Sequence, residues 1–419
     1  MLNILIPTIF VALLFCLALS GRPRFTLSSF VVFCWLLILI CSIGLYKVDE
    51  KYLEINQYIY WGSLYFSLLA VIHLIPFSIS KERKVDCILL PKLRYLNLVA
   101  YLLVVASFIS IFYFLSVCVS VFTSPDLDMF RHLLTTEGHP FIEPGLLNTV
   151  SSAVAIVYLV PLLLSFIYFS LNRRRVLSYL LLISSLSYPV YVFAYFGRDG
   201  VLFWILSFIS VYLLLGNYLQ REEVYRIRRL AMVLGFAGMF LFAVITFFRF
   251  GDINESLQAI LSYGGQQFLN FIIYFDLQIT HTLGARTFTL FHDIYFSTDY
   301  FNTLEMLKQE LAYQNREYMS WEWGTYFKDF YTDYGAFGAL TFIFSYSVYI
   351  CLNFSKLHKK TNLLDILFYL GVCQFALQGI FYFKYYIYVG NIYVFLILSL
   401  PLMSRLFKSK FTLRIEKKW

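Results

Sequence analysis

Residues 95–122 read YLNLVAYLLVVASFISIFYFLSVCVSVF, a run of 28 residues without a charged side chain. A helix of about 20 apolar residues crosses the roughly 30 Å hydrocarbon core of a bilayer, so this run is long enough to span a membrane. The same criterion, applied outward from this run, predicts eleven spans. They are residues 2–20, 25–46, 58–79, 95–122, 148–171, 177–197, 200–219, 230–249, 334–354, 363–382 and 385–404.

The runs lack the alternation of barrel strands, and lipid leaves no backbone group unpaired, so helices are expected. The sequence therefore predicts an all-α polytopic membrane protein with about 11 transmembrane helices. Of the 419 residues, 60% are apolar and 14% are charged, against about 45–50% and about 25% in soluble proteins. These figures exclude a soluble enzyme, a nucleic-acid-binding module and a disordered chain.

The charged residues indicate how the chain is oriented. If the N-terminus lies outside, 23 of the 33 basic residues but only 6 of the 25 acidic residues fall in inside segments. Cytoplasmic loops carry such an excess of Lys and Arg. The sequence therefore predicts an outside N-terminus and an inside C-terminus.

The predicted spans divide the chain into four parts. Residues 1–249 hold eight spans and an acidic outer loop, 123–147; residues 250–333 form one large outer loop; 334–404 hold three spans; and 405–419 form a basic inside tail. Within the large loop, the apolar stretch 268–279 is too short to span and is expected at the interface or folded onto the bundle. Leu304, Leu307 and Leu311 have the spacing of an amphipathic helix.

Three arginines on the outer side need an explanation, because they run against the positive-inside pattern. Arg198 lies in a Gly-Arg-Asp-Gly turn, Arg249 ends the eighth span, and Arg286 lies in the large loop. A guanidinium can bond two phosphate oxygens at once, so these arginines suit a lipid-linked pyrophosphate. The structural alternative is that they reach lipid headgroups or pair with Asp199 and Asp252.

Histidine is the side chain best suited to act as a general base near neutral pH. Four of the six histidines, His132, His139, His281 and His292, lie in the two long outer loops. His281 is five residues before Arg286 and could share its site, and Asp293 could orient His292. Asp252, beside Arg249, is a carboxylate alternative. His73, near the inner end of the third span, and His358, in a basic inside loop, are weaker candidates, and surface solvation is the alternative for each loop histidine.

An aromatic segment with carboxylates leads into the ninth span. Tyr326, Asp329, Tyr331 and Asp333 are candidate substrate-binding residues, since aromatic faces and carboxylates suit sugars. The aromatics could also form only an interfacial belt. Thr325, Asp329 and Asp333 would share one face of a helix, and Asp333 with Gly335 could be a cap and a close packing point.

Other known site patterns are missing from the sequence. It contains no GxGxxG, Walker, HExxH or GxSxG motif, which leaves nucleotide-driven transport and metalloprotease chemistry without support. No Cys or His spacing suggests a metal site or a disulfide framework, and no cofactor is expected.

Together these features resemble the bacterial oligosaccharide repeat-unit polymerases, the O-antigen polymerase family. The matching pieces are Arg198-x-Gly200 ahead of a span, the large late outer loop, and Gly-Thr-Tyr…Tyr-x-Asp-Tyr-Gly-x-x-Gly between Gly324 and Gly338. The family is similar to other lipid-dependent glycosyltransferases and to the O-antigen ligases, in which loop arginines and a histidine serve the active site. This chain departs from the ligase-type Arg-x-x-x-His spacing, which leaves His281 and His292 both open.

The resemblance implies a glycosyltransferase of the bacterial inner membrane with a periplasmic N-terminus and a cytoplasmic C-terminus. It would polymerise polyprenyl-pyrophosphate-linked oligosaccharides into O-antigen or capsular-type polysaccharide, with a chain-length regulator and a flippase as candidate partners. His281, Arg198, Arg249 and Arg286 are the expected catalytic residues, and direct displacement with inversion is expected. The alternatives are an O-antigen ligase and a polysaccharide flippase or transporter, of which a transporter should place polar residues at mid-membrane depth.

Overall fold

The structure is a computed structural model of the chain. It describes residues 2–20, 25–49, 52, 59–80, 82, 85–123, 140–142, 145–172, 174–195, 197, 199–233, 236, 253–296, 300–316, 323–355, 357, 359–407 and 411–418.

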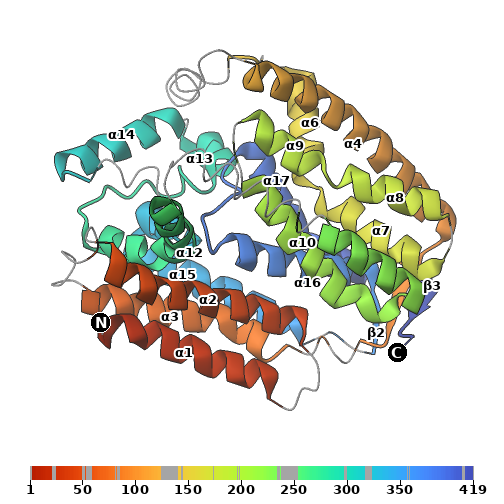
Figure 1. The fold of residues 1–419 in the computed structure, drawn as a ribbon, viewed down its shortest axis with the longest axis horizontal. Coiled ribbons are helices and arrows are strands. Elements are labelled where there is room, and N and C mark those ends of the chain that lie inside the picture. Colours follow the sequence, from red (N-terminus) through yellow and green to blue (C-terminus); the bar gives the residue numbers. More distant parts are fainter. Residues whose placement is uncertain are drawn as a thin grey trace. The chain divides into compact units, whose positions relative to one another are not determined.

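The described residues are mostly helical (Figure 1). The helices are α1 (Leu2–Leu19), α2 (Leu27–Val48), α3 (Ile59–Ser78), α4 (Leu93–Phe122), α6 (Leu146–Ile156), α7 (Leu159–Leu171), α8 (Arg175–Ser184), α9 (Ser187–Ala194), α10 (Asp199–Leu215), the 3-10 helix η3 (Gly216–Tyr218), α12 (Ile253–Asp276), α13 (Thr289–Phe296), α14 (Tyr300–Tyr313), α15 (Tyr326–Phe354), α16 (Leu363–Gln378) and α17 (Tyr388–Leu406). Residues 221–233 are also helical. The strands are β1 (Cys87–Pro91), β2 (Lys360–Asn362) and β3 (Phe411–Glu416).

Seven helices among the described residues are long and apolar enough to cross a membrane. They are Leu27–Val48, Tyr60–Ser78, Leu93–Val121, Arg175–Ala194, Asp199–Tyr218, Tyr326–Phe354 and Tyr388–Leu406. The pair α6 and α7, bent by 49°, meets the same test when the two helices are taken together, as either a broken span or a re-entrant loop. Leu5–Leu19 and Leu363–Gln378 are shorter apolar helices. Of the predicted spans, 230–249 lies largely outside the described residues, as does the outer loop 123–147.

The chain divides into two compact units, which we describe separately. The α15 unit comprises residues 1–84, 239–357 and 375–392, and the sheet unit comprises 85–238, 358–374 and 393–419. In the α15 unit, α1, α2 and α3 pack against one another (Figure 1), and α15 packs on α3. The start of α2 is capped by Thr26, whose hydroxyl accepts from Ser29 N at 3.2 Å, and by the Glu82 carboxylate, which accepts from Leu27 N at 3.3 Å.

Helix α12 contains most of the short apolar stretch 268–279 and packs onto α2 and α3. The approach to α2 is close because Gly265 has no side chain: a Cβ atom there would lie 2.7 Å from the backbone carbonyl of Cys41. Ser42 Oγ donates to Gly265 O at 2.6 Å, which links the two helices. This arrangement matches the second of the two expectations for this stretch, a fold onto the bundle.

The other helices that lie entirely within residues 250–333 are short. Leu304, Leu307 and Leu311 lie on α14, as their spacing predicted, and Leu307 and Leu311 are buried. Helix α13 covers only Thr289–Phe296.

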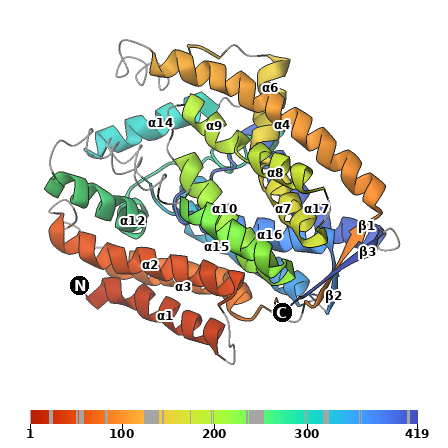
Figure 2. The ribbon, with the colours of Figure 1, turned by 45° about the vertical axis from the view of Figure 1, so that its right-hand side comes forward.

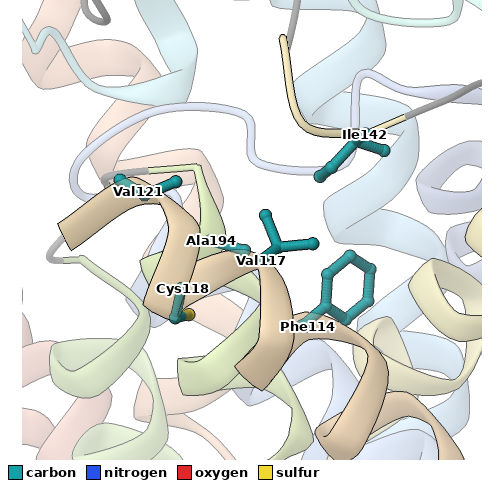
Figure 3. Packing of buried hydrophobic residues seen from close by; sticks show 6 residues of the cluster. All are labelled: Phe114, Val117, Cys118, Val121, Ile142 and Ala194. Carbon is teal, nitrogen blue, oxygen red and sulfur yellow. The ribbon is translucent and has the colours of Figure 1, made fainter. Parts of the chain in front are cut away.

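In the sheet unit, helices α4, α6, α7, α8, α9 and α10 pack together. Figure 3 shows one of their apolar clusters, in which side chains near the end of α4 meet α9 and the segment 140–142. Its buried members are Phe114, Val117, Cys118, Val121, Ile142 and Ala194.

A three-stranded sheet of order β2-β1-β3 is the one departure from the all-α expectation within the described residues (Figure 2). Strand β1 pairs parallel with β2 and antiparallel with β3. Each strand lies in a segment that the sequence assigns to the inside of the membrane. Strands β1 and β2 lie between predicted spans, and β3 follows the last predicted span. The sheet therefore brings three segments of the same predicted side together.

Candidate functional site

The candidate site lies in the α15 unit, where the segment 280–292 meets the first turns of α15. The Asp333 carboxylate, which is 0% exposed, accepts four hydrogen bonds from this segment. Oδ1 accepts from Thr282 Oγ1 at 2.5 Å and from Arg286 N at 3.2 Å, while Oδ2 accepts from Thr287 N at 2.8 Å and Thr287 Oγ1 at 2.6 Å. Asp333 thus closes the loop turn around Gly284, instead of capping a helix as the sequence suggested.

His281 lies at the edge of this turn and is exposed. Its Nδ1 is 3.2 Å from Thr332 O. Because a carbonyl oxygen only accepts, this hydrogen bond requires the proton on Nδ1, which leaves the Nε2 lone pair of the neutral ring available as a base. Gly335 has φ +66°, and a Cβ atom there would lie 2.9 Å from His281 Nε2. The close packing predicted for Gly335 is therefore packing against His281.

Arg286 lies in the Asp333-closed turn, five residues after His281, and a site shared by their two side chains stays a prediction. Its side chain is only 8% exposed, and Nη2 lies 3.4 Å from Thr303 O of α14. In this arrangement the guanidinium connects the loop to α14.

Carboxylates and cations also meet at the first turn of α15. The ammonium of Lys328 is 3.7 Å from Asp329 Oδ1 and 4.9 Å from the centre of the Tyr274 ring. Asp329 Oδ2 accepts from the backbone N–H of Phe383 at 2.6 Å. Asp329 and Asp333 share this helical segment as predicted, whereas Thr325 is the residue that precedes the helix, with non-helical backbone angles of φ −57° and ψ 162°.

The turn between α16 and α17, together with the first turn of α17, completes the site, and sequence reasoning missed it. Asn391, 1% exposed, donates from Nδ2 to Thr287 O at 3.0 Å and accepts at Oδ1 from Leu290 N at 3.0 Å. Thr289 Oγ1 donates to Tyr386 O at 2.5 Å. Lys384 is 9% exposed in this turn. Two signals were available: Lys384 is a cation on the side that the sequence predicts to be outer, and Asn391 is an amide within the apolar run 385–404.

The two tyrosines predicted to bind substrate, Tyr326 and Tyr331, lie where α15 packs against neighbouring helices. Tyr326 is 5% exposed, and its hydroxyl is 2.8 Å from Nδ1 of His73, which is fully buried in α3. Tyr331 donates to Phe275 O at 3.0 Å, and its ring meets that of His281 edge-on at 5.8 Å. Tyr331 therefore supports His281 from the α12 side, and Tyr326 is covered by its neighbours.

His292 and Asp293 do not form the pair that their adjacency suggested. Both lie on α13, where the Asp293 carboxylate accepts from the hydroxyl of Tyr388. The His292 ring contacts Phe296 at 4.8 Å. Asp293 therefore holds α13 to the start of α17 and does not orient His292.

The other predicted site residues, Arg198, Arg249 and Asp252, lie outside the described residues, as do His132 and His139. Among the residues that the structure describes, no three His, Cys, Asp or Glu side chains are grouped so that they could hold a metal ion.

The described geometry therefore joins three segments far apart in sequence: 280–292, the first turns of α15 and the turn before α17. It presents one exposed histidine whose Nδ1 bonds Thr332 O, on segments that also carry the buried cations Arg286 and Lys384 and the carboxylates of Asp329 and Asp333. In comparisons with known proteins, no family model, no curated protein and no solved structure matches this chain.

Proposed function

We propose that the chain is a membrane-embedded glycosyltransferase that polymerises polyprenyl-pyrophosphate-linked oligosaccharide repeat units. The observation that carries the proposal is the placement of His281. The ring is exposed, its Nδ1 is held by Thr332 O, and it lies next to the Asp333-closed turn that also contains Arg286. A general base beside cations is what transfer of a sugar from a pyrophosphate to a hydroxyl requires.

In the proposed reaction, a hydroxyl of the acceptor sugar attacks the anomeric carbon of the donor. The bond from that carbon to the pyrophosphate oxygen breaks, polyprenyl pyrophosphate leaves, and the hydroxyl proton passes to His281 Nε2. One displacement inverts the anomeric configuration. Lys384, Lys328 and Arg286 are the described cations of the site, and Arg198 and Arg249 stay predicted pyrophosphate ligands.

The transmembrane arrangement that goes with this function is also part of the proposal: eleven spans in a bacterial inner membrane, with the N-terminus periplasmic and the C-terminus cytoplasmic. The sheet supports the count. Because β1 and β2 are paired, an even number of crossings must separate residues 91 and 360.

The described candidates between those residues are α4, the α6–α7 pair, α8 with α9, α10 and α15, which make five crossings. The bent pair counts as one crossing because it follows α4 along its length: Ser151 O accepts from Ser110 Oγ, and Tyr168 donates to Asn97 near the start of α4. One further crossing is needed, and the predicted span 230–249 would supply it. Reporter fusions after residues 225 and 300 test this: we expect cytoplasmic and periplasmic signals, respectively, and a cytoplasmic signal after 300 would refute it.

Deleting the gene in the source bacterium tests the reaction. A polymerase mutant should retain single repeat units on its surface lipid and lose the polymer, and the wild-type gene should restore chain length. Accumulation of long chains on the polyprenyl carrier would instead identify a ligase. Accumulation of single lipid-linked units on the cytoplasmic side would identify a flippase.

A further inference from the structure

One end of the sheet unit gathers most of its charged residues. The ends of its elements are tied together there: Tyr218 donates to Val85 O at 2.9 Å, and the Lys418 ammonium and backbone N–H donate to Ser170 O and Asn217 O at 3.0 and 2.9 Å. The described residues of this end include fourteen basic and five acidic side chains. They are Lys92, Arg94, Arg174, Arg175, Arg221, Arg226, Arg228, Arg229, Lys359, Lys360, Arg405, Arg414, Lys417 and Lys418, with Asp86, Glu222, Glu223, Asp365 and Glu416.

Three exposed arginines of this end each contact a tyrosine in the same way. Arg94 donates to the Tyr95 hydroxyl at 2.7 Å, with its guanidinium carbon 4.6 Å from the ring centre. Arg174 donates to Tyr101 at 3.0 Å, and Arg228 donates to Tyr212 at 2.6 Å, each with the guanidinium 5.9 Å from the ring centre. We call these three the Arg–Tyr pairs.

The Arg–Tyr pairs differ from the other cations nearby. Glu223, 1% exposed, takes Arg175 and Arg226 as ion-pair partners at 3.4 and 3.1 Å. Among the described residues, none of Arg94, Arg174 and Arg228 lies within ion-pair distance of a carboxylate. Their charge is therefore not neutralised within the described chain, although each guanidinium is held in place by its tyrosine.

The backbone of Arg174 is unfavourable for a residue with a side chain. It has φ 53° and ψ 56°, in the left-handed region that Gly and Asn adopt most easily. Asn172, two residues earlier, has the same conformation. A strained non-glycine residue of this kind suggests that the side chain itself is needed.

We propose that the Arg–Tyr pairs bind the phosphate groups of anionic phospholipids in the leaflet that this end faces. Tyrosine lies preferentially at the membrane–water interface, and clustered arginines attract acidic headgroups. The tyrosine hydroxyl occupies one donor of each guanidinium and leaves the other N–H groups for phosphate oxygens. The exposed apolar side chains of Leu98 and Val176, 58% and 74% exposed, would contact the acyl region beside the pairs.

Thermal unfolding of the full-length protein in nanodiscs tests this proposal. Wild-type protein should unfold several degrees higher in phosphatidylglycerol than in phosphatidylcholine, and the triple variant Arg94→Gln, Arg174→Gln, Arg228→Gln should lose most of that difference. The matched control is Arg221→Gln, Arg229→Gln, Arg405→Gln, which removes the same charge from exposed arginines of this end that have no tyrosine partner among the described residues. An equal loss in the control, or no lipid difference in wild type, would overturn the proposal.

Two further arms make the result specific. Inorganic phosphate added to protein in phosphatidylcholine should leave the unfolding temperature unchanged; a rise equal to that from phosphatidylglycerol would indicate a soluble phosphate ligand and overturn the lipid assignment. Arg174→Gly keeps the left-handed turn without strain. Its unfolding temperature in phosphatidylcholine should be no lower than that of wild type, but the rise in phosphatidylglycerol should be smaller. A rise equal to that of wild type would show that Arg174 does not bind the lipid.

Discussion

The two units place positively charged side chains in opposite environments. At the candidate site of the α15 unit, Arg286 and Lys384 are 8% and 9% exposed. Arg286 Nη2 lies 3.4 Å from Thr303 O, and the Lys384 ammonium lies 5.3 Å from the centre of the Tyr385 ring. At the basic end of the sheet unit, Arg94 and Arg228 are exposed and rest on tyrosine rings. A cation in the sequence, whichever side it is predicted to face, therefore does not by itself distinguish a site from a membrane belt, whereas its burial in the fold does. This difference predicts that substitutions at the candidate site lower the free energy of unfolding strongly and that substitutions at the basic end of the sheet unit lower it little.

The largest effect is expected for Asp333→Ala. The change leaves the buried N–H groups of Arg286 and Thr287 and two threonine hydroxyls without their acceptor, and each such group costs about 1–3 kcal/mol. We expect a loss of several kcal/mol in the free energy of unfolding and rapid proteolysis within 280–292, both measured in detergent. Asp293→Ala is the matched control, because that carboxylate has one described partner, Tyr388. Equal stability of the two variants would show that Asp333 does not hold the loop.

A smaller effect on stability is expected for Gly335→Ala. The backbone at Gly335, φ 66° and ψ −175°, lies in a region that costs other residues about 1–3 kcal/mol. The added methyl group would also push on His281 Nε2, 2.9 Å away, so polymer formation should fall more than stability. Gly44→Ala, where nothing lies within 4 Å of the new methyl group, should be as stable as wild type or more so. Normal polymer length from Gly335→Ala would show that the position of the His281 ring does not matter for polymerisation.

The smallest effect is expected for Arg228→Gln in the sheet unit. Its guanidinium is exposed and bonds one hydroxyl, and exposed interactions of charged groups contribute about 0–1 kcal/mol. Unfolding in lipid-free detergent should therefore differ little from wild type. A loss as large as that of Asp333→Ala would break the contrast between the two regions.

The apolar helices could be predicted because their signal is local. The run 95–122 lies within α4, Leu93–Phe122, and residues 25–46 lie almost entirely within α2, Leu27–Val48. The sheet could not be predicted in the same way. Its strands are three to six residues long, lie in basic segments, and pair Cys87 with Lys360 and Glu416, so no local periodicity marks them.

The candidate site shows the same limit. His281 and Arg286 were expected together because five residues separate them; the structure places Arg286 in the turn that Asp333 closes and His281 at the edge of that turn. The partners of that turn are 46 residues or more away: Asp333 lies in the first turns of α15, and Asn391 lies in α17. Hydrophobic runs and charge bias carry no information on such pairings, so the role of Asp333 as a loop anchor emerged only from the fold.

The most direct test of the proposed function is polymerisation by the purified protein in nanodiscs, supplied with one polyprenyl-pyrophosphate-linked repeat unit. We predict a ladder of lengthened glycans from wild type and from His292→Ala, and none from His281→Ala at equal folded protein. A ladder of wild-type length from His281→Ala, or no ladder from wild-type protein, would contradict the account.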